Sequence, residues 1–181
     1  STALADTVTV QWSNNGHWYV GQDVNSDNFP YDWAEASSLA TATGGTLVCP
    51  ESYQESEWLY STFGWPLWIG LYQDLDSPDY SEPDGGWTWT AGVPVTYTNW
   101  NGGNPDNSNN SEHWASTFVD GRWLDIDGSP LDGTIFIVEY SADCNGDGVV
   151  DYGQILAGEL EDIDGNGVPD CCDTGKCLKV K

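Results

Sequence analysis

The chain has 181 residues and a formal net charge of −25, because 29 Asp and Glu residues face only 4 Lys and Arg residues. Nucleic acids and anionic membrane surfaces repel such a chain, and no apolar run approaches the ~20 residues that a membrane-spanning helix requires. Its 11 Trp and 9 Tyr residues exclude a solvated coil. We therefore expect one principal globular domain whose acidic residues serve as metal ligands or as a solubilising surface.

The beginning of the chain is expected to be processed and to form a β-hairpin. There is no Met, and Ala3-Leu4-Ala5 has the A-x-A form that signal peptidase prefers, which favours a secreted product. Residues 7–12 alternate between apolar and polar side chains, and residues 17–20 follow across a turn-like Ser-Asn-Asn-Gly sequence.

Two helices are predicted next. Asp32 with Glu35, and Ser52 with Glu55, have the spacing of an N-cap residue and its partner in a capping box. The first helix is expected to place Trp33, Ala36, Leu39 and Ala40 on one face, and the second Trp58, Leu59, Thr62 and Phe63. Glycines that end helices follow at Gly44 and Gly64.

Beyond residue 66 the pattern changes to short apolar strands separated by loops rich in Gly, Asn, Asp and Pro. Two helices followed by a small sheet indicate the α+β class. Loops longer than ~12 to 15 residues usually carry function, so residues 77–112 are the first place to look for a binding site. The strands are expected at residues 67–71, 87–90, 115–119, 122–125 and 134–140.

Several short motifs follow one another in this part of the chain. They are Trp33-Ala34-Glu35-Ala36, Gly44-Gly45-Thr46-Leu47, Trp68-Ile69-Gly70-Leu71, Gly86-Trp87-Thr88-Trp89, Asn99-Trp100, Asn104-Pro105-Asp106, Trp123-Leu124-Asp125 and Phe136-Ile137-Val138-Glu139-Tyr140. In this order they resemble the C-type lectin domain over roughly residues 17–140. The resemblance implies a double-looped α+β fold with two helices and small antiparallel sheets. It also implies a long loop, at about residues 72–112, that holds calcium and a ligand.

The resemblance implies a calcium site in this loop. Sugar-binding members have a Glu-Pro-Asn or Gln-Pro-Asp triplet that supplies two calcium ligands, and Asn104-Pro105-Asp106 stands in its place. A cis peptide before Pro105 would direct the side-chain oxygens of both neighbours to one point. Glu112 and Asp125 match the next carboxylate ligands of the family. The expected Ca²⁺ ligands are therefore Asn104, Asp106, Glu112 and Asp125.

Leu124 departs from the family pattern, because sugar-binding members have an Asn there that touches both calcium and a sugar hydroxyl. Calcium binding is therefore a stronger expectation than sugar binding. Some members hold a second calcium ion beside the first. Its candidate ligands here are Asp74, Asp76, Asn107 and Glu112, with a solvated acidic loop as the equally weighted alternative.

The two usual disulfides of the family are absent, and both cysteines of each are replaced. Ala40 and Val138 stand at the positions of one disulfide, and Trp114 and Gly128 at the positions of the other. Stability is then expected to come from aromatic packing. We assign Trp68, Trp87, Trp89 and Trp123 to the core, and Tyr72, Tyr80 and Trp100 remain candidates for stacking on a sugar ring.

The cysteines are unevenly distributed: Cys49 stands alone, and four others crowd the last forty residues. Cys49 is interpreted as a buried thiol, a cross-link to the tail or an intermolecular bridge. Three pairings are open to the other four, which are Cys144, Cys171, Cys172 and Cys177.

The tail contains two similar acidic loops, at residues 143–154 and 162–173. Both have oxygen side chains at positions 1, 3, 5 and 9 and Gly at position 6, the pattern of a calcium-binding EF-hand loop. Asp173 completes the second loop at position 12, whereas the first has Gln154 there. We expect a weaker first site unless Asp151 or Glu159 compensates. The predicted ligands are Asp143, Asn145, Asp147, Val149 and Asp151 in the first loop, and Asp162, Asp164, Asn166, Val168, Asp170 and Asp173 in the second.

Residues 152–157 read as a short helix between these loops, so the tail resembles the dockerin-type calcium repeats found at the ends of bacterial surface proteins. We divide the chain into a C-type-lectin-like domain, residues 1–141, and an EF-hand-like or dockerin-like tail, residues 142–181. Because the spacing is tighter and the cysteines are atypical, a structural calcium clamp is favoured over a docking module.

No catalytic arrangement is recognisable, since His17 and His113 belong to no metal, triad or Cys-His pattern, and an enzyme is not expected. The leading hypothesis is a calcium-dependent carbohydrate-binding protein that is secreted or displayed on a bacterial cell surface, with a glycan as partner. The alternative is a structural or adhesive subunit in which calcium only stabilises loops. Its partner would be another surface protein or a further copy, in a homopolymer assembled through the strand at residues 7–12.

Overall fold

The computed structural model describes residues 8–21, 30–64, 66–130 and 134–177. Thr7, the expected first residue of the hairpin, and the Ala3-Leu4-Ala5 sequence lie outside the described residues. None of the helices in the described ranges has the length and apolar character needed to cross a membrane.

The strands form a single eight-stranded arrangement in the order β1-β2-β8-β4-β6-β7, with β3 paired to β8 and β5 paired to β4. All strand pairs are antiparallel except β4 with β8, where Leu67 and Trp68 align with Ile135 and Phe136. The predicted hairpin and strands are confirmed to within a few residues, and β3 is an additional two-residue strand. The bounds are β1 Thr9–Gln11, β2 Trp18–Gly21, β3 Thr46–Leu47, β4 Leu67–Gln73, β5 Trp87–Trp89, β6 Trp114–Thr117, β7 Trp123–Ile126 and β8 Ile135–Tyr140.

The two predicted helices are α1 (Trp33–Ala42) and α2 (Tyr53–Phe63). In α1 the capping box is complete: Asp32 accepts a hydrogen bond from the Glu35 amide, and the Glu35 carboxylate accepts one from the Asp32 amide. In α2 only half of it forms, because Ser52 caps the Glu55 amide but the Glu55 side chain turns into the core. Leu39 was wrongly placed on the buried face of α1, since 44% of it is exposed.

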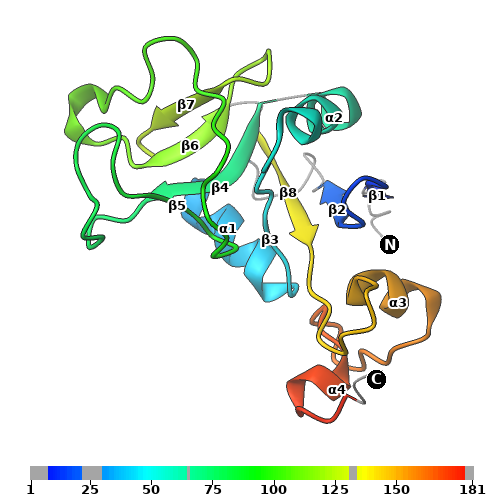
Figure 1. Ribbon diagram of the computed structural model, residues 1–181. Coiled ribbons are helices and arrows are strands. Elements are labelled where there is room, and N and C mark those ends of the chain that lie inside the picture. Colours follow the sequence, from blue (N-terminus) through cyan, green and yellow to red (C-terminus); the bar gives the residue numbers. More distant parts are fainter. Residues whose placement is uncertain (1–7, 22–29, 65, 131–133, 178–181) are drawn as a thin grey trace.

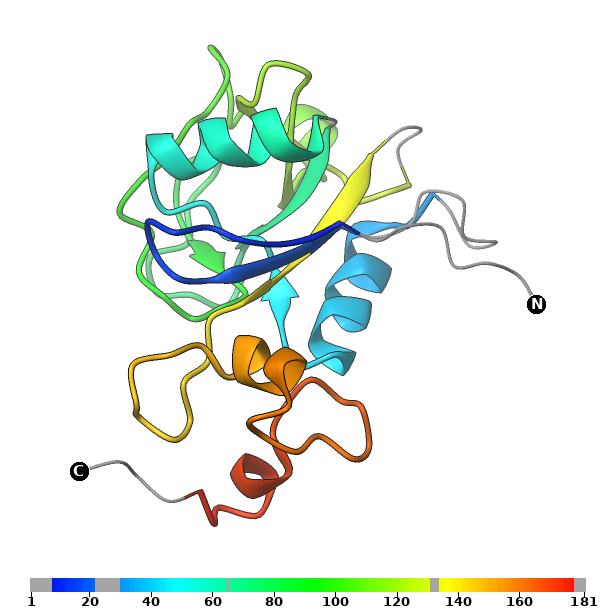
Figure 2. The same cartoon turned by 90° about the vertical axis from the view of Figure 1, so that its right-hand side faces the viewer.

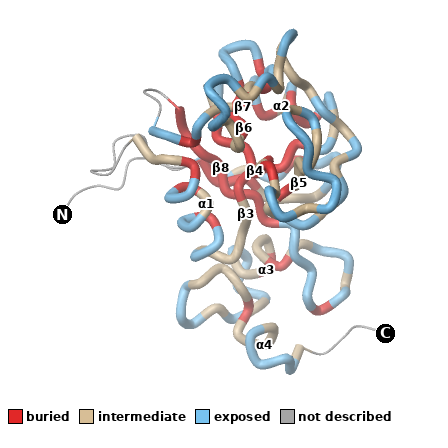
Figure 3. Tube along the Cα trace, turned by 90° about the vertical axis from the view of Figure 1, so that its left-hand side faces the viewer, coloured by how far each residue is buried: buried red, intermediate tan, exposed pale blue. Residues whose placement is uncertain are grey.

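Buried residues concentrate along the central strands (Figure 3). Alternate residues of β4 and β8 belong to two different core clusters, which therefore lie on the two sides of the sheet. Trp68, Trp89 and Trp123 are at most 2% exposed, as predicted, whereas Trp87 is half-buried at the edge of its cluster. The positions of the missing disulfides are filled by packing. Ala40 and Val138 share one buried cluster, and the ring of Trp114 lies so close to Gly128 that a Cβ there would be 2.7 Å from it.

The tail lies below the sheet, at the opposite end of the molecule from β6 and β7 (Figures 1 and 2). It contains the predicted short helix, α3 (Asp151–Ala157), and a single turn, α4 (Asp170–Asp173). A short 3₁₀ turn, Ser108–Asn110, lies in the long loop.

Candidate functional site

Three of the predicted calcium ligands meet at the end of the long loop. Asp106, Glu112 and Asp125 each offer a carboxylate oxygen, and these oxygens lie within 4.8 Å of one another. Asp125 stands on β7 and is 2% exposed, while the other two flank the 3₁₀ turn. The peptide bond between Asn104 and Pro105 is cis, as expected. Residues separated by up to 19 positions are thus brought to one point.

Asp125 holds the loop in place through its backbone. Its carboxylate accepts hydrogen bonds from the Asp106 amide at 2.9 and 3.0 Å and from the Asn107 amide at 2.7 Å. The Oδ2 atom accepts two of these bonds, whereas Oδ1 accepts one and keeps a second lone pair available. Asp125 therefore fixes the peptide that follows the Asn-Pro-Asp triplet and remains able to bind a cation.

The segment between Asp106 and Glu112 is closed by its own side chains. Asp106 accepts hydrogen bonds from the Ser108 amide, at 3.0 Å, and the Ser108 hydroxyl, at 2.6 Å. Glu112 accepts one from the same amide at 2.8 Å, and the Asn107 side chain accepts one from the Glu112 amide at 3.1 Å. Asn107 has a φ of 47°, a left-handed conformation that Asn tolerates better than most residues. These bonds orient two carboxylates toward Asp125.

The electrostatics of the cluster favour a cation. Burial raises the pKa of Glu112, and the nearby charges of Asp125 and Asp106 raise it further. Three carboxylates that repel one another are stabilised by a divalent ion, and hard oxygen donors of this kind suit Ca²⁺. The donor set present therefore fits calcium.

The remaining predicted residues of this region lie in different settings. Asn104 is half-buried, and its backbone N–H donates to the backbone carbonyl of Asn101 at 2.9 Å. Leu124 is half-buried and aligns with Ser116 of β6. Asp74 accepts a hydrogen bond from the Asp76 amide at 3.0 Å, and among the described residues neither belongs to a group of three or more metal-binding side chains. The second ion, with Asp74, Asp76, Asn107 and Glu112 as its candidate ligands, stays a prediction.

The stacking candidates differ in exposure. Tyr72 packs on Trp33 with ring centroids 5.7 Å apart, and Trp100 packs on Trp87 at 4.9 Å. Tyr80 is 37% exposed, and its hydroxyl donates to Glu82 at 2.6 Å. Of the three, Tyr80 offers the most surface to a ligand.

The two tail loops share one hydrogen-bond pattern. In each, the carboxylate at position 1 accepts hydrogen bonds from the backbone amides at positions 4, 5 and 6, and the carboxylate at position 9 accepts one from the amide at position 2. Asp143 and Asp162 fill position 1, and Asp151 and Asp170 fill position 9. The sequence duplication is thus a structural duplication.

Each loop has a feature that suits a cation. Asp162, Asp164 and Asp170 lie within 4.8 Å of one another. In the first loop Asp151 is 2% exposed, and its Oδ1 atom is buried without a hydrogen-bond partner. A buried carboxylate oxygen without a partner is costly, and a bound cation removes that cost. The first loop therefore fits a metal ion, as does the second.

The side chain at position 12 bonds to other side chains of each loop. Gln154 donates to Asp147 at 2.7 Å and accepts a hydrogen bond from the Asn145 side chain at 3.2 Å. Asp173 accepts one from the Asn166 side chain at 3.1 Å. A neutral amide thus stands in the first loop where a carboxylate stands in the second.

The tail cysteines pair as Cys144 with Cys172 and Cys171 with Cys177. The first bond joins the two acidic loops to each other. Cys49 is a buried free thiol, which was one of the three possibilities, and burial raises its pKa to about 12.

The tail packs directly on the body of the protein. Tyr152 of α3 stacks on Tyr140 of β8, with ring centroids 3.8 Å apart and planes 9° apart, and meets Trp18 edge-on at 6.3 Å. In the second loop Gly167 and Val168 lie against Thr43 and Gly44 at the end of α1. No pattern in the sequence indicated the contact of the second loop with α1, because it joins segments more than a hundred residues apart.

A buried polar network beside the hairpin was also not predicted. Tyr19 donates to Glu55 at 2.6 Å and to Glu139 at 3.3 Å, and the His17 ring contacts Glu139 at 2.6 Å. Glu55 and Glu139 are 2% and 5% exposed. Burial, followed by the charge of Glu139, raises the pKa of Glu55. The only signal in the sequence was a Glu inside an otherwise apolar strand, at residue 139.

Comparison with known proteins gives a family. The family model described as "Lectin C-type domain" matches residues 29–133, more than half of the chain. The low affinity immunoglobulin epsilon Fc receptor of Mus musculus is 33% identical over 94 residues, which cover 51% of this chain and 26% of the receptor. The chain thus spans about a quarter of the length of that relative.

Solved structures agree on the fold. The cow C-type carbohydrate-recognition domain of CD23, in the presence of a GlcNAc2Man3 oligosaccharide, has a TM-score of 0.58 and 24% identity, over 71% of this chain and 91% of that one. A calcium-independent type II antifreeze protein has a TM-score of 0.57 and 21% identity, over 75% of this chain and 98% of that one. The chain belongs to the C-type lectin domain family.

Proposed function

We propose that the chain is a calcium-dependent carbohydrate-binding protein that works outside the cell, as a secreted or bacterial cell-surface protein. Asn104, Asp106, Glu112 and Asp125 are the proposed ligands of one Ca²⁺ ion. The observation that carries the proposal is that the carboxylate oxygens of Asp106, Glu112 and Asp125 lie within 4.8 Å of one another. Hydrogen bonds from loop amides to these carboxylates hold the loop in this conformation. The fold alone would not suffice, because a structural neighbour is described as calcium-independent.

The chemistry of the site follows from its donors. A bound Ca²⁺ ion with open coordination positions accepts oxygen ligands such as the vicinal hydroxyls of a sugar. Asp125 orients the Asp106 amide, and Ser108 orients both Asp106 and Glu112. Because Leu124 offers no hydrogen bond, sugar orientation must come from the carboxylates and from neighbouring side chains such as Tyr80. A weaker and less selective lectin is expected than one with an amide there.

Glycan-array binding tests this proposal. The wild type should bind in calcium and lose its signal with a chelator, and Asp106→Asn should fail in both conditions. Asp84→Asn is the matched control, since Asp84 is an exposed residue of the same long loop outside the carboxylate cluster. Binding that survives both the chelator and Asp106→Asn would contradict the proposal.

The self-assembling structural subunit is not favoured. That hypothesis depended on Leu124 and on an edge strand at residues 7–12. The strand that the structure describes in this segment, β1, has only three residues. Short edge strands are a common protection against pairing between chains.

For the tail we propose a calcium clamp with two ions, held by the residues predicted above for each loop. The supporting observation is the buried Oδ1 atom of Asp151, which has no hydrogen-bond partner. Asp151 directly precedes Tyr152, whose ring stacks on Tyr140. An ion in the first loop would fix Asp151 and thereby the start of α3. Thermal unfolding should then shift upward in calcium by more in the wild type than in Asp151→Asn, and equal shifts would contradict the clamp.

A further inference from the structure

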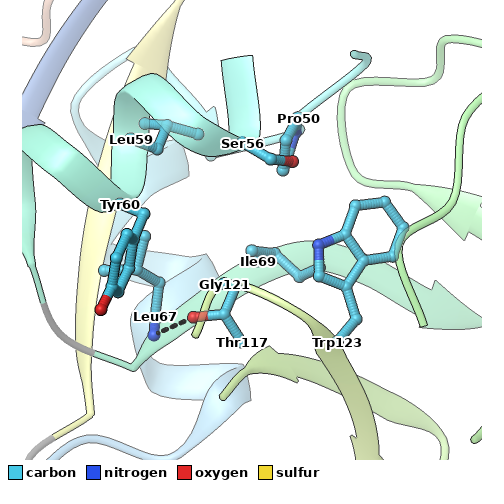
Figure 4. A pocket seen from close by; sticks show the side chains of 9 residues that line it. All are labelled: Pro50, Ser56, Leu59, Tyr60, Leu67, Ile69, Thr117, Gly121 and Trp123. Atoms are coloured by element: carbon cyan, nitrogen blue, oxygen red, sulfur yellow. Dashed lines mark hydrogen bonds between the residues drawn. The ribbon is translucent and has the colours of Figure 1, made fainter. Parts of the chain in front are cut away.

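A small cavity lies between α2 and the sheet (Figure 4). Leu59, Leu67 and Ile69 form much of its wall, and Ser56 and Trp123 contribute polar atoms. The space available to the centre of a water molecule is about 10 Å³. That is close to the ~10 to 15 Å³ that one water molecule needs.

The polar atoms at this cavity lack protein partners. Trp123 is fully buried and Ser56 is 7% exposed, and neither the Trp123 Nε1 atom nor the Ser56 hydroxyl has a hydrogen-bond partner. Figure 4 shows the indole nitrogen and the serine on facing sides of the space. Tyr97 lies outside the cavity wall, and its ring meets that of Trp123 edge-on at 5.5 Å.

Two other buried indoles of the protein are satisfied directly. Trp33 donates to the Ile69 carbonyl at 2.8 Å, and Trp68 donates to the Tyr31 carbonyl at 3.0 Å. The Nε1 atom of Trp18, away from this cavity, is also buried without a partner. At this cavity two unpaired polar atoms line one water-sized space, and each costs free energy unless something bonds to it.

We propose that this cavity is a binding site for one internal water molecule. The water accepts a hydrogen bond from Trp123 Nε1 and bonds to the hydroxyl of Ser56. It thereby joins α2 to β7, two residues before Asp125 on the same strand. Two to four partners are typical of a buried water, so the site is complete without further groups.

The sign of a stability change tests the proposal. If the water is present, Ser56→Ala removes one of its partners and lowers the midpoint of thermal unfolding. If the cavity is dry, the same change removes an unpaired buried hydroxyl and raises the midpoint. Ser61→Ala is the matched control, since Ser61 is an exposed residue of α2 whose hydroxyl donates to the Trp58 carbonyl at 2.9 Å, and its effect should be small.

A crystal structure of the wild type that resolves ordered waters gives an independent readout. The expected result is one peak within ~2.7 to 3.2 Å of Trp123 Nε1 and of a hydroxyl. An empty cavity, or a direct bond from Nε1 to Ser56, would overturn the proposal. Neither measurement involves calcium or sugar, so the water site stands or falls independently of the proposed function.

Discussion

The contact between the tail and α1 predicts that two chemically identical substitutions have different costs. Gly148 and Gly167 occupy position 6 of the two tail loops, with φ values of 87° and 79°. A Cβ atom on Gly148 would have nothing within 4 Å, whereas one on Gly167 would overlap the carbonyl oxygen of Thr43. Alanine in either loop strains the same turn, but only Gly167→Ala forces the tail away from α1.

The magnitudes follow from what moves. Left-handed alanine costs ~1 to 2 kcal/mol, so Gly148→Ala should destabilise by about that amount. Gly167→Ala should add the loss of the Val168 contact with Gly44 and the weakening of the stack between Tyr140 and Tyr152. An aromatic pair contributes ~0.5 to 1.5 kcal/mol beyond its buried area, and burial of a Val side chain ~1.5 kcal/mol or more. We expect Gly167→Ala to cost roughly 2 to 3 kcal/mol more than Gly148→Ala.

Urea unfolding in calcium, followed by tryptophan fluorescence, measures this difference. Under the clamp proposal the difference should shrink when EDTA replaces calcium, because an apo tail is held less firmly. Equal losses for the two variants in calcium would refute the reasoning, since the tail would then not be packed on α1 in solution.

Three further predictions concern single residues. Burial alone would lower the pKa of His17, but the hydrogen bond and charge of Glu139, helped by other nearby carboxylates, raise it above 6.5. The stability that protonated His17 contributes is complete below its unfolded pKa and lost as the pH rises through the raised value. His17→Gln should therefore cost more at pH 6 than at pH 9 in urea unfolding with EDTA, and a pH-independent cost would contradict this. Gln154→Glu should tighten calcium binding to the first tail loop at least tenfold, as measured by calorimetry. It should also destabilise the calcium-free protein, because the new carboxylate would repel that of Asp147. Unchanged calcium affinity would show that position 12 is not a ligand. Cys49, whose pKa is raised to about 12, should resist alkylation in the native protein and react on unfolding, so rapid native labelling would contradict its burial.

Local features of the fold were predictable from the sequence because they depend on neighbouring residues. The Asp32 and Glu35 spacing specified the cap of α1, and the two acidic repeats specified two loops with one hydrogen-bond pattern. The convergence of Asp106, Glu112 and Asp125 was available only through the family resemblance, because no periodicity brings a strand residue to a loop 13 to 19 positions away.

Features that depend on tertiary placement were missed. Glu55 has a capping-box spacing, yet its carboxylate bonds to the Tyr19 hydroxyl in the core and to the Glu51 amide, one residue before the N-cap. Leu39 fits the apolar face of α1 in the sequence but stays exposed in the fold. The packing of Gly167 on Thr43 requires two close backbones that no local pattern encodes. Long-range contacts of this kind need the assembled structure.

Calorimetric titration of calcium into the wild type and Asp106→Ala, each with and without simple sugars, tests the central claim most directly. The account predicts that the variant loses one calcium site and retains those of the tail, and that sugar produces heat only in the wild type with calcium present. Calcium binding confined to the tail in both proteins, or the absence of sugar heat under every condition, would contradict the claim that this is a calcium-dependent lectin.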